Sequence, residues 1–99
     1  MITRVPSHDT ELEQLVLGAI LLDGKAMTSV MALITPERFY DPKNATIFEV
    51  MAELYIISTP IDILTVTQAV RKKRLLDQAG GPAYIAGLTN RVASTANLE

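Results

Sequence analysis

Apolar and polar residues alternate along this chain with the period of an α-helix. The first predicted helix runs from about Asp9 to Leu22, and its apolar positions recur every three or four residues: Leu12, Leu15, Val16, Ala19 and Ile20. Three more leucines widen the stripe until most of the circumference is apolar: Leu17, Leu21 and Leu22. A helix that is apolar on most sides is typical of the centre of a domain.

Gly18 interrupts this apolar helix. Glycine costs about 1 kcal/mol relative to alanine inside a helix. Its presence therefore predicts that another helix crosses closely at this point, and that a larger side chain there destabilises the fold.

The rest of the chain is divided by proline and glycine into short helical segments. Asp41-Pro42 and Asp62 have the residue types that begin helices, and Gly80-Gly81-Pro82 breaks the chain before the last one. The predicted segments are 25–34, a short turn over 36–40, 42–57, 63–73 and 82–91. In the segment 63–73 the side chains expected to face inward are Leu64, Val66, Thr67 and Val70. Since no segment alternates as a strand does, the fold class is all-α, a compact bundle of about six short helices.

Two glutamates of the first helix raise the question of acid/base chemistry. Glu11 and Glu13 are two residues apart, about 200° around a helix, so they cannot converge on one substrate. They are expected to complement the positive end of the helix dipole, in the first turns after the candidate caps Ser7 and Asp9.

Composition narrows the possible classes of protein. The chain has 99 residues, 48% of them apolar, and a net charge of −2, which suits one small domain and gives no general attraction to phosphate or anionic lipid. It has no cysteine, which excludes disulfides and thiolate metal sites and permits a reducing, cytoplasmic compartment. The longest apolar run, 15–22, is far shorter than the roughly 20 residues of a membrane span, and no signal peptide is recognisable.

The residues needed for catalysis or cofactor binding do not assemble into a motif. The glycine-rich stretch "AGGPA" lacks the spacing of a phosphate-binding loop, and His8 is the only histidine. His8 is assigned a surface or capping role, because one imidazole makes neither a metal site nor a nucleophilic triad. We therefore expect no catalytic, cofactor-binding or metal residues, and no enzymatic activity, in this chain.

Two surface patches remain as candidate sites. Arg71, Lys72, Lys73 and Arg74 form a basic run at the end of a helix, where cations suit the dipole and could also contact phosphate. Ile56 and Ile57 follow Tyr55 where the helix should become polar, so at least one isoleucine is expected to point outward and bind a partner. Partial burial of the isoleucines in the core is the alternative, and the preferred one from the pattern alone.

Four motifs in order resemble the N-terminal domain of replicative DnaB-type DNA helicases, over about 6–98. The motifs are "E-x-E-Q-x-x-L-G-A-I-L-L-D" from Glu11, "F-Y-D-P-K-N-A-T-I-F" from Phe39, "P-I-D-I-L-T-V" from Pro60 and "L-D-Q-A-G-G-P-A-Y-I-A-G-L" from Leu76. The resemblance implies a helical head over 9–92 with an arm over 1–8, and a connection over 93–99 to a helical hairpin and an ATPase motor.

The resemblance also implies a role. Domains of this family pair into a collar on a hexameric ring around single-stranded DNA, and the collar serves primase and helicase loaders. Sister subunits, primase and loader are thus the expected partners, with no membrane. ATP and Mg²⁺ are expected only in the motor, as is most contact with DNA. The alternative is a small helical nucleic-acid-binding module that uses the run Arg71 to Arg74.

The chain departs from the family pattern at two places. Family members usually have glycine where Arg74 stands, so the helix end near Lys73 must be made without the conformational freedom of glycine. Ile56 and Ile57 replace residues that are commonly polar. This substitution suggests a contact that is particular to the lineage of this chain.

Overall fold

The computed structural model describes residues 6–96, with side chains over 10–93, and within these limits it contains helices and no strand. The helices are α1 (Pro6–Leu22), the 3₁₀ turn η1 (Gly24–Ala26), α2 (Met27–Met31), the 3₁₀ turn η2 (Pro36–Arg38), α3 (Pro42–Ile56), α4 (Ile63–Lys72) and α5 (Pro82–Ala96). The predicted all-α class is confirmed, with five α-helices in the described part instead of about six.

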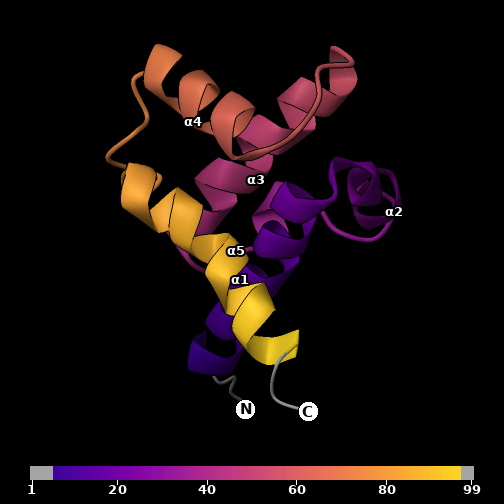
Figure 1. The fold of residues 1–99 in the computed structure, drawn as a ribbon, viewed down its shortest axis with the longest axis vertical. Coiled ribbons are helices and arrows are strands. Elements are labelled where there is room, and N and C mark those ends of the chain that lie inside the picture. The colour runs from indigo at the N-terminus through magenta and orange to yellow at the C-terminus, as the bar shows by residue number, and fades with distance from the viewer. Residues whose placement is uncertain (1–5, 97–99) are drawn as a thin grey trace.

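Two long helices define one half of the molecule. α1 and α5 pack against each other, and α1 begins at the end of the molecule where α5 finishes (Figure 1). α3 lies behind this pair, α4 crosses the opposite end and packs on α3 and α5, and α2 forms a small lobe beside α3 (Figure 1). The core therefore lies where α1, α3 and α5 meet.

The buried face of α1 is rotated about the helix axis relative to the face that the sequence predicted. Leu17, Ile20 and Leu21 are buried, whereas Leu12 and Ala19, which the pattern placed inside, are exposed. A helix that is apolar on most sides does not reveal which side its neighbours cover. The other buried apolar residues of the core are Met27, Phe39, Ile47, Phe48, Val50, Met51, Leu54, Ile61, Val66, Val70, Ala79, Ile85 and Leu88.

Gly18 lies at the crossing of α1 and α5, as its position in the apolar helix predicted. A Cβ atom placed there would clash with the backbone carbonyl of Leu88 and lie 2.8 Å from Cγ2 of Val92. The first of these neighbours is backbone, which cannot move aside without displacing α5. Glycine at this position is what allows the two helices to touch.

Both predicted aspartate caps are confirmed. Asp41 accepts a hydrogen bond from the backbone N–H of Lys43 at 2.8 Å and is followed by Pro42 at the first helical position. Asp62 and Thr65 form a reciprocal capping box, with backbone-to-side-chain distances of 2.8 and 3.0 Å. These caps determine the residues at which α3 and α4 begin.

Several helix bounds differ from the sequence prediction. α1 begins at Pro6, three residues before Asp9, and the side chains of the candidate caps Ser7 and Asp9 and of His8 lie outside the described residues. The segment 25–34 divides into a 3₁₀ turn and the five-residue α2. α5 continues beyond Arg91 to Ala96, because no proline or glycine follows Arg91 to end it.

Two helices end in a left-handed residue that is not glycine. Ser58 after α3 and Arg74 after α4 have φ of 59° and 62°. In each case the next residue donates its N–H to a carbonyl five residues back, Thr59 to Leu54 at 2.9 Å and Leu75 to Val70 at 2.8 Å. Both ends are Schellman motifs, so α4 stops near Lys73 as predicted even though Arg74 occupies the position that favours glycine.

Candidate functional site

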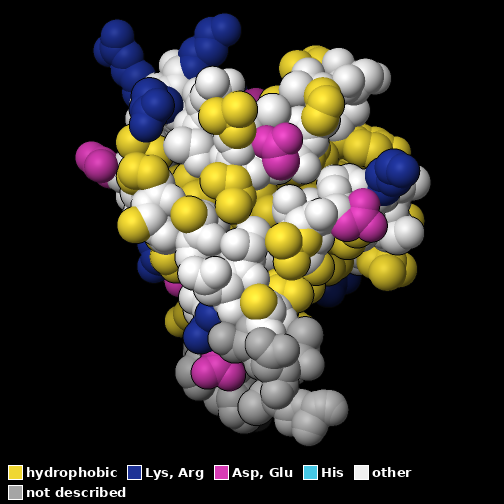
Figure 2. Space-filling model, viewed as in Figure 1, with side chains coloured by type: hydrophobic (Ala, Val, Ile, Leu, Met, Phe, Trp, Pro, Cys, Tyr) yellow, Lys and Arg dark blue, Asp and Glu magenta, His cyan; other side chains and the backbone are white. Residues whose placement is uncertain are grey.

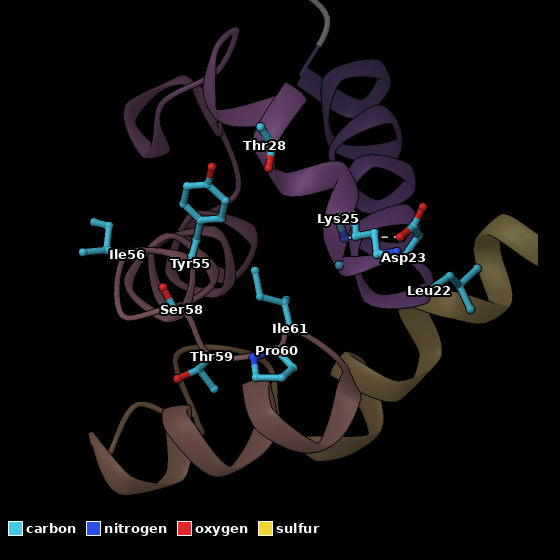
Figure 3. A pocket seen from close by; sticks show the side chains of 11 residues that line it. Leu22, Asp23, Lys25, Thr28, Tyr55, Ile56, Ser58, Thr59, Pro60 and Ile61 are labelled. Carbon is cyan, nitrogen blue, oxygen red and sulfur yellow. Dashed lines mark hydrogen bonds between the residues drawn. The ribbon is translucent and has the colours of Figure 1, made fainter.

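An open groove of about 910 Å³ lies between two segments that are far apart in the sequence. One wall is the end of α1 with η1 and the start of α2, and the other is the end of α3 with the loop that follows it (Figure 3). The lining residues are Leu22, Asp23, Gly24, Lys25, Thr28, Tyr55, Ile56, Ser58, Thr59, Pro60 and Ile61. We call this hollow the α1–α3 groove.

The floor of the groove is built by a close backbone approach. A Cβ atom on Gly24 would lie 2.7 Å from the carbonyl oxygen of Ile61, so glycine is required where the two segments touch. Ile61 is buried, and its side chain lies between the two walls in Figure 3. Asp23 accepts a hydrogen bond from the N–H of Lys25 at 3.2 Å, which starts the 3₁₀ turn at one rim.

Tyr55 and Ile56 form the opposite wall and its outer edge. In Figure 3 the ring of Tyr55 points toward Thr28 across the groove, whereas Ile56 points away from it. Ile56 is 71% exposed and Ile57 67% exposed, so the preferred expectation of partial burial in the core was wrong for both. α3 ends here in a left-handed turn, which leaves its last apolar side chains beyond the reach of the core. We call Ile56 and Ile57 the isoleucine ridge.

More apolar side chains are exposed around this end of the molecule. Leu22 is 60% exposed and Leu64 is 64% exposed, so the expectation that Leu64 faces inward was also wrong. α4 buries only Val66 and Val70, four residues apart, because one short face of this helix meets the core. Thr67, which was also expected to face inward, is only partly buried. Figure 2 shows hydrophobic side chains scattered across this half of the visible face.

The basic run lies at the end of α4, apart from the groove. Arg71, Lys72, Lys73 and Arg74 are all exposed. Lys73 forms an ion pair with Glu53 of α3 at 2.9 Å, which ties the end of α4 to α3. Figure 2 shows Lys and Arg side chains projecting beyond the body of the molecule at the end occupied by α4. None of these four basic residues lines the α1–α3 groove.

Sequence reasoning missed a buried polar network around Glu13. Glu13 is the eighth residue of α1 and only 8% exposed, so its expected role at the helix dipole was wrong. Its carboxylate accepts hydrogen bonds from the backbone N–H groups of Tyr40 and Asp41 and, at 2.9 Å, from Nδ2 of Asn44. The partners are 27 to 31 residues away in the chain, so no local pattern shows them. Glu11, by contrast, is exposed.

Tyr84 extends this network to α5. Its hydroxyl donates to Oδ1 of Asn44 and accepts from Nε2 of Gln14 at 3.2 Å. Burial raises the pKa of the Tyr84 hydroxyl above its ordinary value, and the hydrogen bond from Gln14 partly offsets this effect. The network joins α1, α3 and α5, and we call it the Glu13 network.

The described residues were also compared with the side-chain groups that bind metal ions and with the helices that cross membranes. Within the described residues no three His, Cys, Asp or Glu side chains are grouped so that they could hold a metal ion. No described helix is both long enough and apolar enough to cross a membrane. What the α1–α3 groove offers is apolar surface next to a few polar groups, which is the chemistry of protein contact.

Comparison with known families identifies the fold. Residues 5–99 match the family described as the DnaB-like helicase N terminal domain. The chain therefore belongs to the DnaB-like helicase N-terminal domain family, and the resemblance drawn from the four motifs is confirmed.

Individual relatives agree with this assignment. The replicative DNA helicase DnaB of Rhodothermus marinus is 44% identical and that of Treponema pallidum 38% identical, each over 97% of this chain. The N-terminal domain of DnaB helicase from Mycobacterium tuberculosis superimposes with a TM-score of 0.80 at 32% identity, covering 88% of this chain and 63% of that one. The chain spans 10% and 22% of the length of the first two relatives.

Proposed function

We propose that this chain is a non-catalytic assembly and docking domain of a replicative DNA helicase. It associates with sister subunits in a collar and presents surface to primase or a helicase loader during replication. The observation that carries the proposal is the α1–α3 groove with its isoleucine ridge, in a domain whose family is that of the replicative helicases. Large exposed apolar side chains beside a groove are typical of a surface that binds protein.

Unwinding belongs, in this proposal, to a motor outside these 99 residues. ATP and Mg²⁺ bind there, and so does most of the single-stranded DNA. The present domain positions the other components, because it holds neighbouring subunits together and keeps partners near the replication fork. The proposed location of the protein is the cytoplasm, where bacteria replicate their chromosome, since the named relatives are bacterial replicative helicases.

A second function, nucleic-acid binding by the basic run, is supported by the exposure of Arg71, Lys72 and Arg74 at one end of α4. Lys73 is already paired with Glu53, and the net charge of the chain is −2. Binding through phosphates would weaken steeply with salt, roughly tenfold or more between 50 and 200 mM for three contacts. A fluorescence anisotropy titration with single-stranded DNA at these two salt concentrations separates this function from docking.

A domain exchange tests the leading proposal. In the Treponema pallidum helicase, the 96 matched residues are replaced by this chain, and a second protein lacks them altogether. We expect the exchanged protein to form the native oligomer by mass photometry and to be stimulated by primase in an unwinding assay. The shortened protein should retain ATP hydrolysis but lose stimulation. Equal behaviour of the shortened and exchanged proteins would contradict an assembly role.

A further inference from the structure

We infer that an exposed face of α4 binds a short acidic segment of a partner protein, in which a large aliphatic side chain lies three or four residues from two or more carboxylates. The inference rests on the proposed docking function and assigns part of it to a second surface. This surface consists of Leu64, Gln68, Arg71 and Lys72, with Arg74 just beyond the helix. None of these residues lines the α1–α3 groove. We call the surface the α4 face.

The first argument is geometric. Helical spacing places the four exposed side chains of the α4 face within about 100° of one another around the helix, whereas Val66 and Val70 point to the opposite side and are buried. Leu64 lies near the amino end of the helix and the cations lie at its carboxyl end, about 11 Å apart along the axis. Three or four residues of extended chain cover that span. A single short segment therefore reaches both ends of the face.

The second argument is that three of the four cations have no partner in the described part of the chain. Lys73 is paired with Glu53 at 2.9 Å. The side chains of Arg71, Lys72 and Arg74 form no ion pair or hydrogen bond with any described residue. The last carbonyls of α4 do not require them, because backbone N–H groups of the Schellman motif already donate to these carbonyls. The three charges are therefore available to carboxylates of another molecule.

The backbone of Arg74 supports the same conclusion. Its φ of 62° is a left-handed conformation, in which glycine is more stable than arginine. No hydrogen bond or ion pair of the guanidinium with a described residue offsets this cost. Residues held in such conformations occur preferentially at functional sites. A ligand of the guanidinium gives a reason for arginine at this position.

The chemistry of the α4 face favours an acidic protein segment over a nucleic acid. Residues 63–76 contain no aromatic side chain, so the bases of a single strand have no surface on which to stack. Leu64 is 64% exposed and offers an apolar contact that suits an aliphatic side chain and not a phosphate. The net charge of the whole chain is −2, so attraction for anions depends on this local cluster.

The charges along α4 also determine how the segment is placed. The exposed carboxylate of Asp62 repels other carboxylates from the amino end of the helix. At the other end, the exposed Asp77 follows Arg74 by three residues and offsets only part of the positive charge. The acidic part of the segment therefore lies over the carboxyl end, and its aliphatic side chain lies over Leu64. Charge sets the register of such a contact more than its strength.

The test measures the binding of a labelled peptide by fluorescence anisotropy. The peptide has one central leucine, two serines on each side of it and three aspartates at each end. Its carboxylates follow and precede the leucine at the required spacing, so the peptide can bind in either direction. A contact this small predicts binding to the unaltered chain at high micromolar concentration and low salt.

Three variants of the chain locate the binding site. Arg71→Gln combined with Lys72→Gln should weaken peptide binding at least fivefold, and Leu64→Ser should weaken it at least threefold. The matched control is Lys25→Gln combined with Arg38→Gln, which removes two exposed cations elsewhere and gives the same net charge. The control should weaken binding by less than twofold. All five positions are exposed, so thermal melts should show a folded domain in each case.

Arg74→Gly separates binding from stability. Glycine relieves the left-handed backbone at this position, so the midpoint of unfolding should rise. Peptide binding should nevertheless weaken at least twofold, because one of the three available cations is lost. A damaged fold cannot produce both changes together.

Two further probes distinguish the proposed segment from bare charge and from nucleic acid. A peptide with serine in place of its leucine should bind the unaltered chain at least threefold more weakly, and Leu64→Ser should weaken it no further. A single-stranded thymidine oligonucleotide with six phosphates, equal in charge to the six aspartates, should bind more weakly than the leucine peptide.

Four results would overturn the inference. They are no binding of the leucine peptide at millimolar concentration, equal weakening by the matched control, peptide binding that Leu64→Ser leaves unchanged, and tighter binding of the oligonucleotide than of the peptide. The last result would support the nucleic-acid function instead. None of them affects the domain exchange, which tests docking without reference to the α4 face. Peptide binding together with a failed exchange would reject the helicase role and leave the binding site in place.

Discussion

The two ends of this domain use their side chains in different ways. Where α1, α3 and α5 meet, Gly18 allows backbone contact, and Glu13 accepts three hydrogen bonds from groups brought from elsewhere in the chain. At the end that carries the α1–α3 groove, Leu22, Ile56 and Ile57 are mostly exposed. The first arrangement stabilises a fold, and the second leaves apolar surface for another molecule. The difference suggests that stability and binding can be altered separately by mutation.

The largest effect should come from removing the carboxylate of the Glu13 network. Glu13→Ala leaves two backbone N–H groups and the Asn44 amide without their acceptor, which should lower the free energy of unfolding by about 2 to 4 kcal/mol. Glu11→Ala on the same helix is the control and should change it by less than about 0.5 kcal/mol, since Glu11 is exposed. Urea unfolding measures both. Similar losses in the two variants would show that the network contributes little.

The helix crossing should give the next largest effect. Gly18→Ala forces a methyl group against the carbonyl of Leu88 and should cost about 2 kcal/mol, and Gly18→Leu should cost more. Gly87→Ala is the matched variant on α5, where a Cβ atom meets nothing within 4 Å. It should stabilise the domain by up to about 1 kcal/mol, because alanine favours the helix. The melting temperature should therefore fall for Gly18→Ala and rise for Gly87→Ala. Shifts of the same sign in the two variants would contradict the close approach of α1 and α5 at Gly18.

The capping box at the start of α4 should contribute about 1 kcal/mol. Asp62→Ala removes the acceptor for the N–H of Thr65 and should lower stability by that amount. Asp77→Ala removes an exposed carboxylate that starts no helix, and we expect less than half the effect. Chemical denaturation at neutral pH compares the two. If Asp77→Ala is the more damaging, the cap does not determine where α4 begins.

The smallest of the stability effects should be a gain. Arg74 has φ of 62°, a conformation that costs non-glycine residues roughly 1 kcal/mol or more. Arg74→Gly removes this cost and should raise the free energy of unfolding by about 0.5 to 1 kcal/mol, after allowance for the greater freedom of glycine in the unfolded chain. Arg71→Gly, inside α4, should have the opposite sign. A loss with Arg74→Gly would mean that the side chain itself stabilises the helix end.

Local patterns were enough to predict much of the fold. The caps at Asp41 and Asp62 and the break at Gly80-Gly81 depend on residues within a few positions of one another, and all three are present. The glycine inside an apolar helix also predicted the close crossing at Gly18, but not its partner Leu88, which is 70 residues away. The rotation of α1 was not predictable, because leucines cover most of its surface. The exposure of Leu64 was missed for a related reason, since a helix of ten residues has too few turns to define its buried face.

The candidate site was predictable only in part. The sequence predicted a protein contact at Tyr55, Ile56 and Ile57, because apolar residues continue there although the end of a helix is expected to be polar. The structure places these residues at the edge of a groove. The opposite wall comes from 22–28, more than 25 residues earlier, and nothing in either segment indicates that they meet. The Glu13 network was hidden in the same way. Local periodicity carries no information on which distant segments pack together.

The most direct measurement is the urea midpoint of unfolding as a function of protein concentration, for the unaltered chain and for Ile56→Lys. Binding of a second copy stabilises the folded state by mass action, so the midpoint of the unaltered chain should rise with concentration. The variant should match it at low concentration and show no rise. A lower midpoint for the variant in dilute solution would make Ile56 part of the stabilising core, and a constant midpoint for the unaltered chain would contradict its proposed association with sister subunits.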